Sequence, residues 1–151
     1  MKYIPFLQFG QFLFSQSFEE IKAKIGAYSH VTISHMTELA KQYPSIYIQD
    51  IDLLIIFNEN GDQVRFAETT TDITLEGHNL HTQSIADVMA HFGQYDEDIL
   101  LNEEGSVESA KYGFIVSKDS EKIGNEVLIG SKSYFDDEEI TPDDIIKFYL
   151  K

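Results

Sequence analysis

The pattern of hydrophobic and polar residues predicts a mixture of short helices and antiparallel strands. Apolar residues recur at helical spacing over 18–25, 85–92 and 142–150, and these segments follow Ser17, Ser84 and Thr141, residues suited to an N-cap. Runs rich in β-branched, aromatic and other apolar residues predict strands over 3–9, 46–57, 64–68, 99–101, 112–117 and 127–135. We therefore expect an α+β fold.

Two segments carry the most specific local signals. The run 46–57 and the alternating strand 64–68 are joined by Asn58-Glu-Asn-Gly61, whose Asn-Gly pair suits the positive φ of a tight turn. This hairpin is the clearest β prediction. The segment 29–43 is ambiguous, but Ser34 can cap a helix over 35–42 that Pro44 would end, and we favour that helix.

The first two helical segments belong to a motif that occurs twice. Residues 10–26 and 77–93 align without a gap at an offset of 67, whereas composition alone gives about one identity in such a window. Each copy has a serine N-cap, an acid three residues later, an apolar helical face and a closing glycine. Six positions are identical: Gly10/Gly77, Leu13/Leu80, Gln16/Gln83, Ser17/Ser84, Ala23/Ala90 and Gly26/Gly93.

We interpret this motif as the sign of an internal duplication. The expected repeats cover about 1–70 and 71–135, and each contains a strand, a helix and then antiparallel strands. The two repeats would share one antiparallel sheet with the helices on one face. The chain of 151 residues is expected to form a single domain, with the helix 142–150 docked on it.

The charge balance bears on the class of partner. The chain has 26 acidic and 11 basic residues, a formal net charge of −15. This charge disfavours nucleic acid and favours a basic protein, although acidity for solubility alone explains it equally well. The absence of cysteine excludes disulfides and thiolate chemistry and suits the cytoplasm. No apolar run could cross a bilayer, and residues 1–10 do not resemble a signal peptide.

No catalytic motif is recognisable. The nucleophile elbow, the Walker loop, the dinucleotide fingerprint and the EF-hand spacing are all absent from the sequence. Three histidines lie in the second copy of the motif, but the first copy has Gln11, Phe14 and Lys24 at the positions of His78, His81 and His91. We therefore predict no metal, no cofactor and no enzymatic activity. A small metal-dependent hydrolase that uses these histidines remains an alternative.

The remaining class is recognition of another macromolecule. An open sheet face rimmed by acids could present aromatic side chains such as Tyr47, which is the anatomy of a protein interface. The candidate partner-binding residues are acids and aromatics in the second half of the chain: Asp96, Glu97, Asp98, Tyr112, Tyr134, Phe135, Asp136, Asp137, Glu138 and Glu139.

Two resemblances sharpen this expectation. The pattern Gly-x-x-Leu-x-Ser/Thr-Gln-Ser resembles the tandem-repeat fold of β-lactamase inhibitor proteins and small outer-membrane assembly lipoproteins. Residues 52–61, 77–93, 112–114 and 129–135 resemble the small acidic immunity proteins of bacterial polymorphic toxin systems. The second resemblance implies a cytoplasmic protein that binds and neutralises a cognate toxin, for which a nuclease is one candidate. The alternative is a structural or regulatory domain that forms a homodimer through an exposed edge strand.

Overall fold

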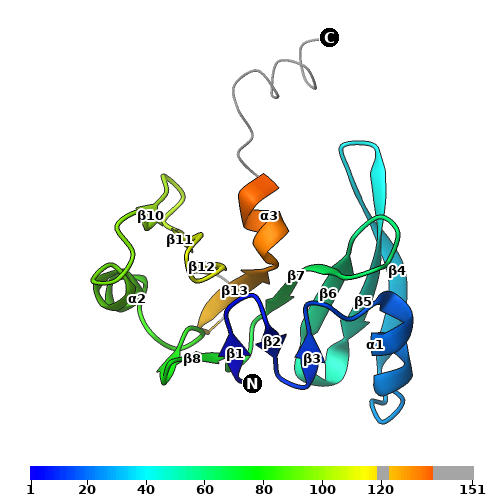
Figure 1. Cartoon of the computed structure of the whole chain (residues 1–151). Helices are drawn as coiled ribbons and strands as arrows, with labels where there is room; N and C mark the ends of the chain where they lie inside the picture. Colours follow the sequence, from blue (N-terminus) through cyan, green and yellow to red (C-terminus); the bar gives the residue numbers. More distant parts are fainter. Residues whose placement is uncertain (119–122, 138–151) are drawn as a thin grey trace.

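The computed structural model describes residues 1–118 and 123–137, and an antiparallel sheet dominates them (Figure 1). Its eight strands lie in the order β10-β11-β12-β13-β7-β6-β5-β4. Together with three short α-helices, this sheet agrees with the expected α+β class. The strands are β4 (Val31–Glu38), β5 (Lys41–Ile48), β6 (Leu53–Phe57), β7 (Val64–Thr69), β10 (Leu100–Leu101), β11 (Val107–Ser109), β12 (Phe114–Lys118) and β13 (Asn125–Gly130).

The sheet is made of two meanders of four strands each. Strands β4 to β7 form one and β10 to β13 form the other, and they meet where β13 pairs antiparallel with β7. A small β ladder and a helix precede each meander. The first ladder contains β1 (Tyr3–Ile4), β2 (Gln8–Phe9) and β3 (Phe12–Leu13), followed by α1 (Phe18–Lys24). The second contains β8 (Thr74–Leu75) and β9 (His78–Asn79), followed by α2 (Ile85–Phe92).

Helices α1 and α2 cover one face of the sheet and form the hydrophobic core with it. Ile21 of α1 and Phe92 of α2 are fully buried in the same cluster as the strand residues Ile55 and Ile129. The N-caps predicted for α1 and α2 are confirmed, because the side chain of Ser17 accepts a hydrogen bond from the Glu20 amide, and that of Ser84 from the Asp87 amide, each at 3.1 Å. The third predicted cap in the described residues, Ser34, lies in strand β4 instead.

The opposite face, which we call the open face, carries Tyr47, Leu54, Glu68 and Leu128 in adjacent register on four neighbouring strands. Helix α3 (Lys132–Asp137) lies on this side, where the Tyr134 ring is 5.0 Å from the ring of Phe66. The helices are therefore not all on one face. The predicted helix 142–150 lies outside the described residues.

The strand predicted over 127–135 is too long. Strand β13 ends at Gly130, and the Ser131 side chain then accepts a hydrogen bond from the Tyr134 amide at 3.2 Å, which starts α3. A Cβ atom on Gly130 would lie only 2.7 Å from Tyr134 Cδ1, so the absence of a side chain lets the helix fold back over the strand. Tyr134 and Phe135, which were predicted in the strand, therefore belong to α3.

The helix predicted over 35–42 is wrong. Strands β4 and β5 pair from Val31↔Ile48 to Glu38↔Lys41, and Leu39 and Ala40 form the two-residue turn between them. Both turn residues have positive φ, 52° and 64°, as a type I′ turn requires. Strand pairing along eight residues outweighs the weak helical pattern. The run 46–57 also contains more than a strand, because the 3₁₀ turn η1 (Gln49–Ile51) separates β5 from β6.

The residues of the two-residue turn between β4 and β5 can be replaced by better ones. Leucine and alanine are poor residues for positive φ, whereas Asn-Gly is the preferred type I′ pair. The double substitution Leu39→Asn and Ala40→Gly is expected to raise the free energy of unfolding by about 1 kcal/mol. Urea denaturation of the two proteins measures the difference, and an unchanged or lower midpoint would count against the assigned turn.

No helix within residues 1–118 and 123–137 combines the length and the apolar character that crossing a membrane requires.

Candidate functional site

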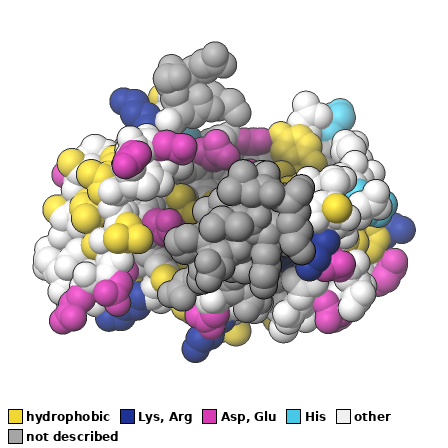
Figure 2. Space-filling model, turned by 90° about the horizontal axis from the view of Figure 1, so that it is seen from above, with side chains coloured by type: hydrophobic (Ala, Val, Ile, Leu, Met, Phe, Trp, Pro, Cys, Tyr) yellow, Lys and Arg dark blue, Asp and Glu magenta, His cyan; other side chains and the backbone are white. Residues whose placement is uncertain are grey.

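An acidic hollow lies on the open face, at the junction of the two meanders. Its volume is about 160 Å³. Figure 2, which looks onto this side of the molecule, shows several acidic side chains in a row near the top of the view. The hollow is lined by Tyr47, Asp52, Leu54, Glu68, Thr69, Thr70 and Glu126.

Strand register places these side chains together. Tyr47 lies opposite Leu54, Leu54 opposite Glu68, and Glu68 opposite Leu128, so all four project from the same face. Glu126 is two residues before Leu128 on β13 and therefore projects from this face too. The pairing of β7 with β13 thus brings Glu68 and Glu126 side by side, although they are far apart in the sequence.

Glu68 and Glu126 form a carboxyl pair. Burial raises the pKa of Glu68 to about 6, and the negative charge of Glu126 and the hydrogen bond between the two carboxyl groups add to this effect. Among the described residues, neither carboxylate forms an ion pair with a basic side chain. The hollow therefore holds two adjacent carboxyl groups whose ionised forms a cation would stabilise.

Asp52 forms the other wall of the hollow. Its carboxylate accepts a hydrogen bond from the Tyr47 hydroxyl at 2.5 Å and another from the Thr70 hydroxyl. The hydrogen bond to Asp52 raises the pKa of Tyr47, and burial and the charge of Asp52 act in the same direction. Tyr47 consequently remains a neutral donor, and its ring contributes an aromatic surface beside the carboxylates.

The carboxyl pair makes stability depend on pH. Glu68 has a pKa of about 6 in the folded protein against an ordinary value of 4.5, so the folded state binds more protons between these values. Stability therefore falls as the pH rises from about 4.5 to about 6 and stays lower above that. We expect Glu68→Gln to raise the free energy of unfolding at pH 7.5 by about 1 kcal/mol, after allowance for solvent screening, with little effect at pH 4.

Urea denaturation at pH 4 and pH 7.5 tests this prediction. Glu103→Gln is the matched control, because Glu103 is exposed in the turn after β10 and makes the same change in charge. If the two variants follow the same pH dependence, the Glu68 carboxyl does not have the raised pKa.

Those sequence-predicted binding residues that the structure describes fall into two groups on opposite sides of the sheet. In the first group, Asp96 is buried and accepts hydrogen bonds from the Ser109 hydroxyl at 2.7 Å and the Asp98 amide at 3.0 Å. The Tyr112 ring packs 5.1 Å from Phe92 on the helix-covered side. Asp96 and Tyr112 therefore have structural contacts, whereas Glu97 and Asp98 are exposed.

The second group lies on the open face. Tyr134, Phe135, Asp136 and Asp137 belong to α3, and the Tyr134 ring also lies 5.1 Å from the Arg65 guanidinium. Glu138 and Glu139 lie outside the described residues. Sequence analysis did not single out Glu68 or Glu126. The available signal was an acid within each of two apolar strands, but only the register shows that the two acids meet.

The histidines do not converge on a metal site. The rings of His78 and His91 stack with centroids 3.6 Å apart, while His81 Nδ1 lies 2.7 Å from the Asn125 carbonyl oxygen. In the described part of the chain, no group of three or more histidine, aspartate or glutamate side chains could hold a metal ion.

Comparisons with protein-family models, with curated proteins and with solved structures give no match to this chain. The geometry and the charge of the hollow are therefore the basis for a functional proposal.

Proposed function

We propose that the chain is a non-catalytic binding module of the immunity type, a cytoplasmic protein that neutralises a bacterial toxin by binding it directly. The observation that carries the proposal is the Glu68–Glu126 pair, two half-buried carboxylates in a hollow beside the Tyr47 ring. A lysine or arginine side chain of the partner would enter this hollow. The partner is accordingly a basic protein, with a nuclease as one candidate, and the chain needs no cofactor.

Electrostatics supports this assignment both at contact within the hollow and during the approach of the partner. Burial and then the charge of Glu126 raise the pKa of Glu68, and a cation within the hollow would offset both effects. The partial burial of the carboxylates strengthens their attraction for that cation. Farther away, the formal charge of −15 accelerates the encounter with a positively charged protein. The same charge repels the phosphate backbone of nucleic acid.

We also propose that the two halves are tandem repeats of one ancestral unit. An equivalent hydrogen bond in each half supports this. The Val64 amide donates to the Phe14 carbonyl at 3.0 Å, and the Asn125 amide donates to the His81 carbonyl at 2.8 Å. Phe14 and His81 occupy the same position of the repeated motif, and Val64 and Asn125 each begin the last strand of a meander. Duplication would thus have created the hollow at the junction of the copies.

The test of the binding function is inhibition of a toxin. Basic proteins encoded by the genes on either side of this one are purified and tested for toxicity, and any toxin among them is assayed with increasing amounts of the chain. We expect complete inhibition near a molar ratio of one and a stable complex on a sizing column. Full toxin activity in the presence of a molar excess would contradict the proposal.

A further inference from the structure

Strand β4 forms one edge of the sheet, and within residues 1–118 and 123–137 this edge has none of the usual protection. It pairs with β5 along all eight residues without a register shift. The stretch 31–37 contains no Lys, Arg, Asp, Glu or Pro, although the chain as a whole is strongly charged. Proteins normally shield a long edge with charges, proline or a bulge, because unpaired backbone groups there recruit another strand.

The register identifies the backbone groups on the free side. The residues that flank a two-residue type I′ turn exchange both backbone hydrogen bonds, so Glu38 and Lys41 form such a pair. Alternation along the ladder then directs the amides and carbonyls of every second residue away from β5. These outward residues are Val31, Ile33, His35 and Thr37, and they have no other backbone partner among the described residues.

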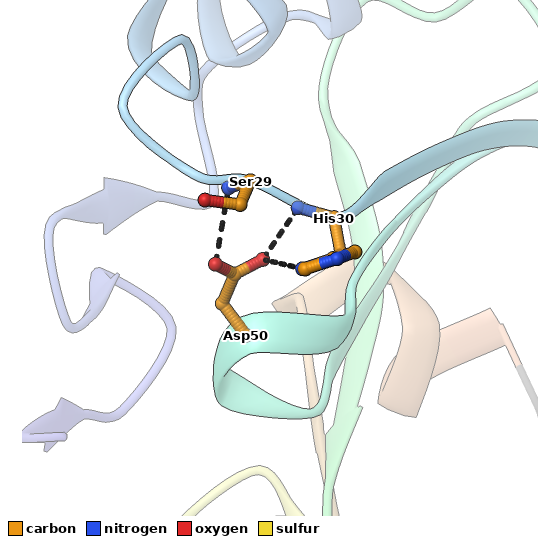
Figure 3. Close-up of polar contacts among 3 residues, drawn as sticks. All are labelled: Ser29, His30 and Asp50. Carbon is orange, nitrogen blue, oxygen red and sulfur yellow. Dashed lines mark hydrogen bonds and ion pairs between the residues drawn. The ribbon is translucent and has the colours of Figure 1, made fainter.

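The edge is held in place at both ends. At its start, the Asp50 carboxylate accepts hydrogen bonds from the Ser29 amide at 3.0 Å and the His30 amide at 2.8 Å (Figure 3). The hydrogen bond from the Ser29 amide lowers the pKa of Asp50 most, and the bond from the His30 amide lowers it further. At its end, Glu38 forms an ion pair with Arg65 at 3.1 Å. A strand fixed in this way loses little conformational entropy when a second strand binds.

We infer that an extended segment of the basic partner pairs with β4 and continues the sheet by one strand. The inference rests on the proposed function for the basic character of the partner. Either a second copy of this chain or a segment of the partner could pair with β4, and charge decides between them. A second copy has the same formal net charge of −15 and is repelled, whereas a basic segment is attracted. Thr32 of β4 lies opposite Tyr47 of the hollow, so alternate side chains of the added strand project from the open face.

A substitution at Ile33 separates the contribution of its backbone amide to binding from that of its side chain. Ile33→Pro removes an outward amide without removing a β4–β5 hydrogen bond, and proline is tolerated on edge strands in that orientation. Ile33→Ala is its control, because it shortens the same half-exposed side chain and keeps the amide. The two variants must show the same circular dichroism as the original chain.

The probe is an eight-residue peptide of alternating lysine and valine with blocked ends, used with the full chain. We expect it to slow hydrogen exchange at the amides of Ile33, His35 and Thr37 at least fivefold. Ile33→Pro should weaken peptide binding about tenfold, and Ile33→Ala less than twofold. A peptide N-methylated at its two central residues, so that both of its edges are blocked, should not bind the original chain. Equal binding of that peptide, or protection confined to other segments, would overturn the inference.

Two further measurements assign a failure to its cause. If the toxin complex forms equally well with the original chain and with Ile33→Pro, the edge inference is wrong and the binding function stands. If the peptide protects β4 but no toxin complex forms, the function is wrong and the edge property stands. Sedimentation of the free chain tests whether a second copy of the chain, rather than a partner segment, pairs with β4. If the free chain is a dimer and Ile33→Pro dissociates it, the second copy is the occupant and the inference is overturned.

Discussion

Replacing Glu68 and Glu126 together by glutamine is expected to weaken the complex with a basic partner by at least about 30-fold. The reason is that the hollow loses both charges that the entering cation would meet, and loss of one side of a buried charge pair typically costs 2 kcal/mol or more. The free protein should become more stable at the same time, because glutamine removes the repulsion within the carboxyl pair. Calorimetry with the toxin domain and urea denaturation measure the two effects.

The control for this experiment is the pair Glu103→Gln and Glu104→Gln. Both residues are exposed in the turn after β10, so this variant changes the net charge by the same amount away from the hollow. It should lower the association rate slightly and leave the dissociation rate unchanged. If both double variants weaken the complex equally, the effect is one of overall charge, and the hollow is not the contact site.

Phe92→Ala is expected to lower the free energy of unfolding by about 3 to 5 kcal/mol. Phe92 is fully buried where α2 meets the sheet, and its ring lies 5.3 Å from the ring of Phe114 and 5.1 Å from that of Tyr112. Truncation removes these contacts and leaves a cavity that the paired strands cannot close. Thermal and urea denaturation give the loss.

Tyr95→Ala is the matched aromatic control. Tyr95 follows α2 closely, but 54% of it is exposed, so its truncation should cost less than about 1 kcal/mol. A loss below 1 kcal/mol for Phe92→Ala would show that α2 does not anchor the second half of the sheet.

Local sequence determined the two capped helices. The serine N-caps and the apolar stripes of α1 and α2 act within one or two helical turns, and so the sequence pattern predicts these helices. The hairpin of β6 and β7 was predictable from the turn residues between its strands. The loop 58–63 is longer than a two-residue turn, and of the pair Asn60-Gly61 only Gly61 has positive φ, 68°. These features depend on interactions between residues that are close in the chain.

Tertiary structure decided the β4–β5 hairpin, the placement of α3 and the acidic hollow. Residues 35–42 carry a weak helical pattern, and they form strands because β4 pairs with β5 along eight residues. The far end of β5, residues 45–48, is in turn paired with β6. Glu68 and Glu126 are ordinary strand acids in the sequence and become a carboxyl pair only because β13 pairs with β7. A pKa shift of this kind arises from burial and from a neighbouring charge, and long-range strand register creates both.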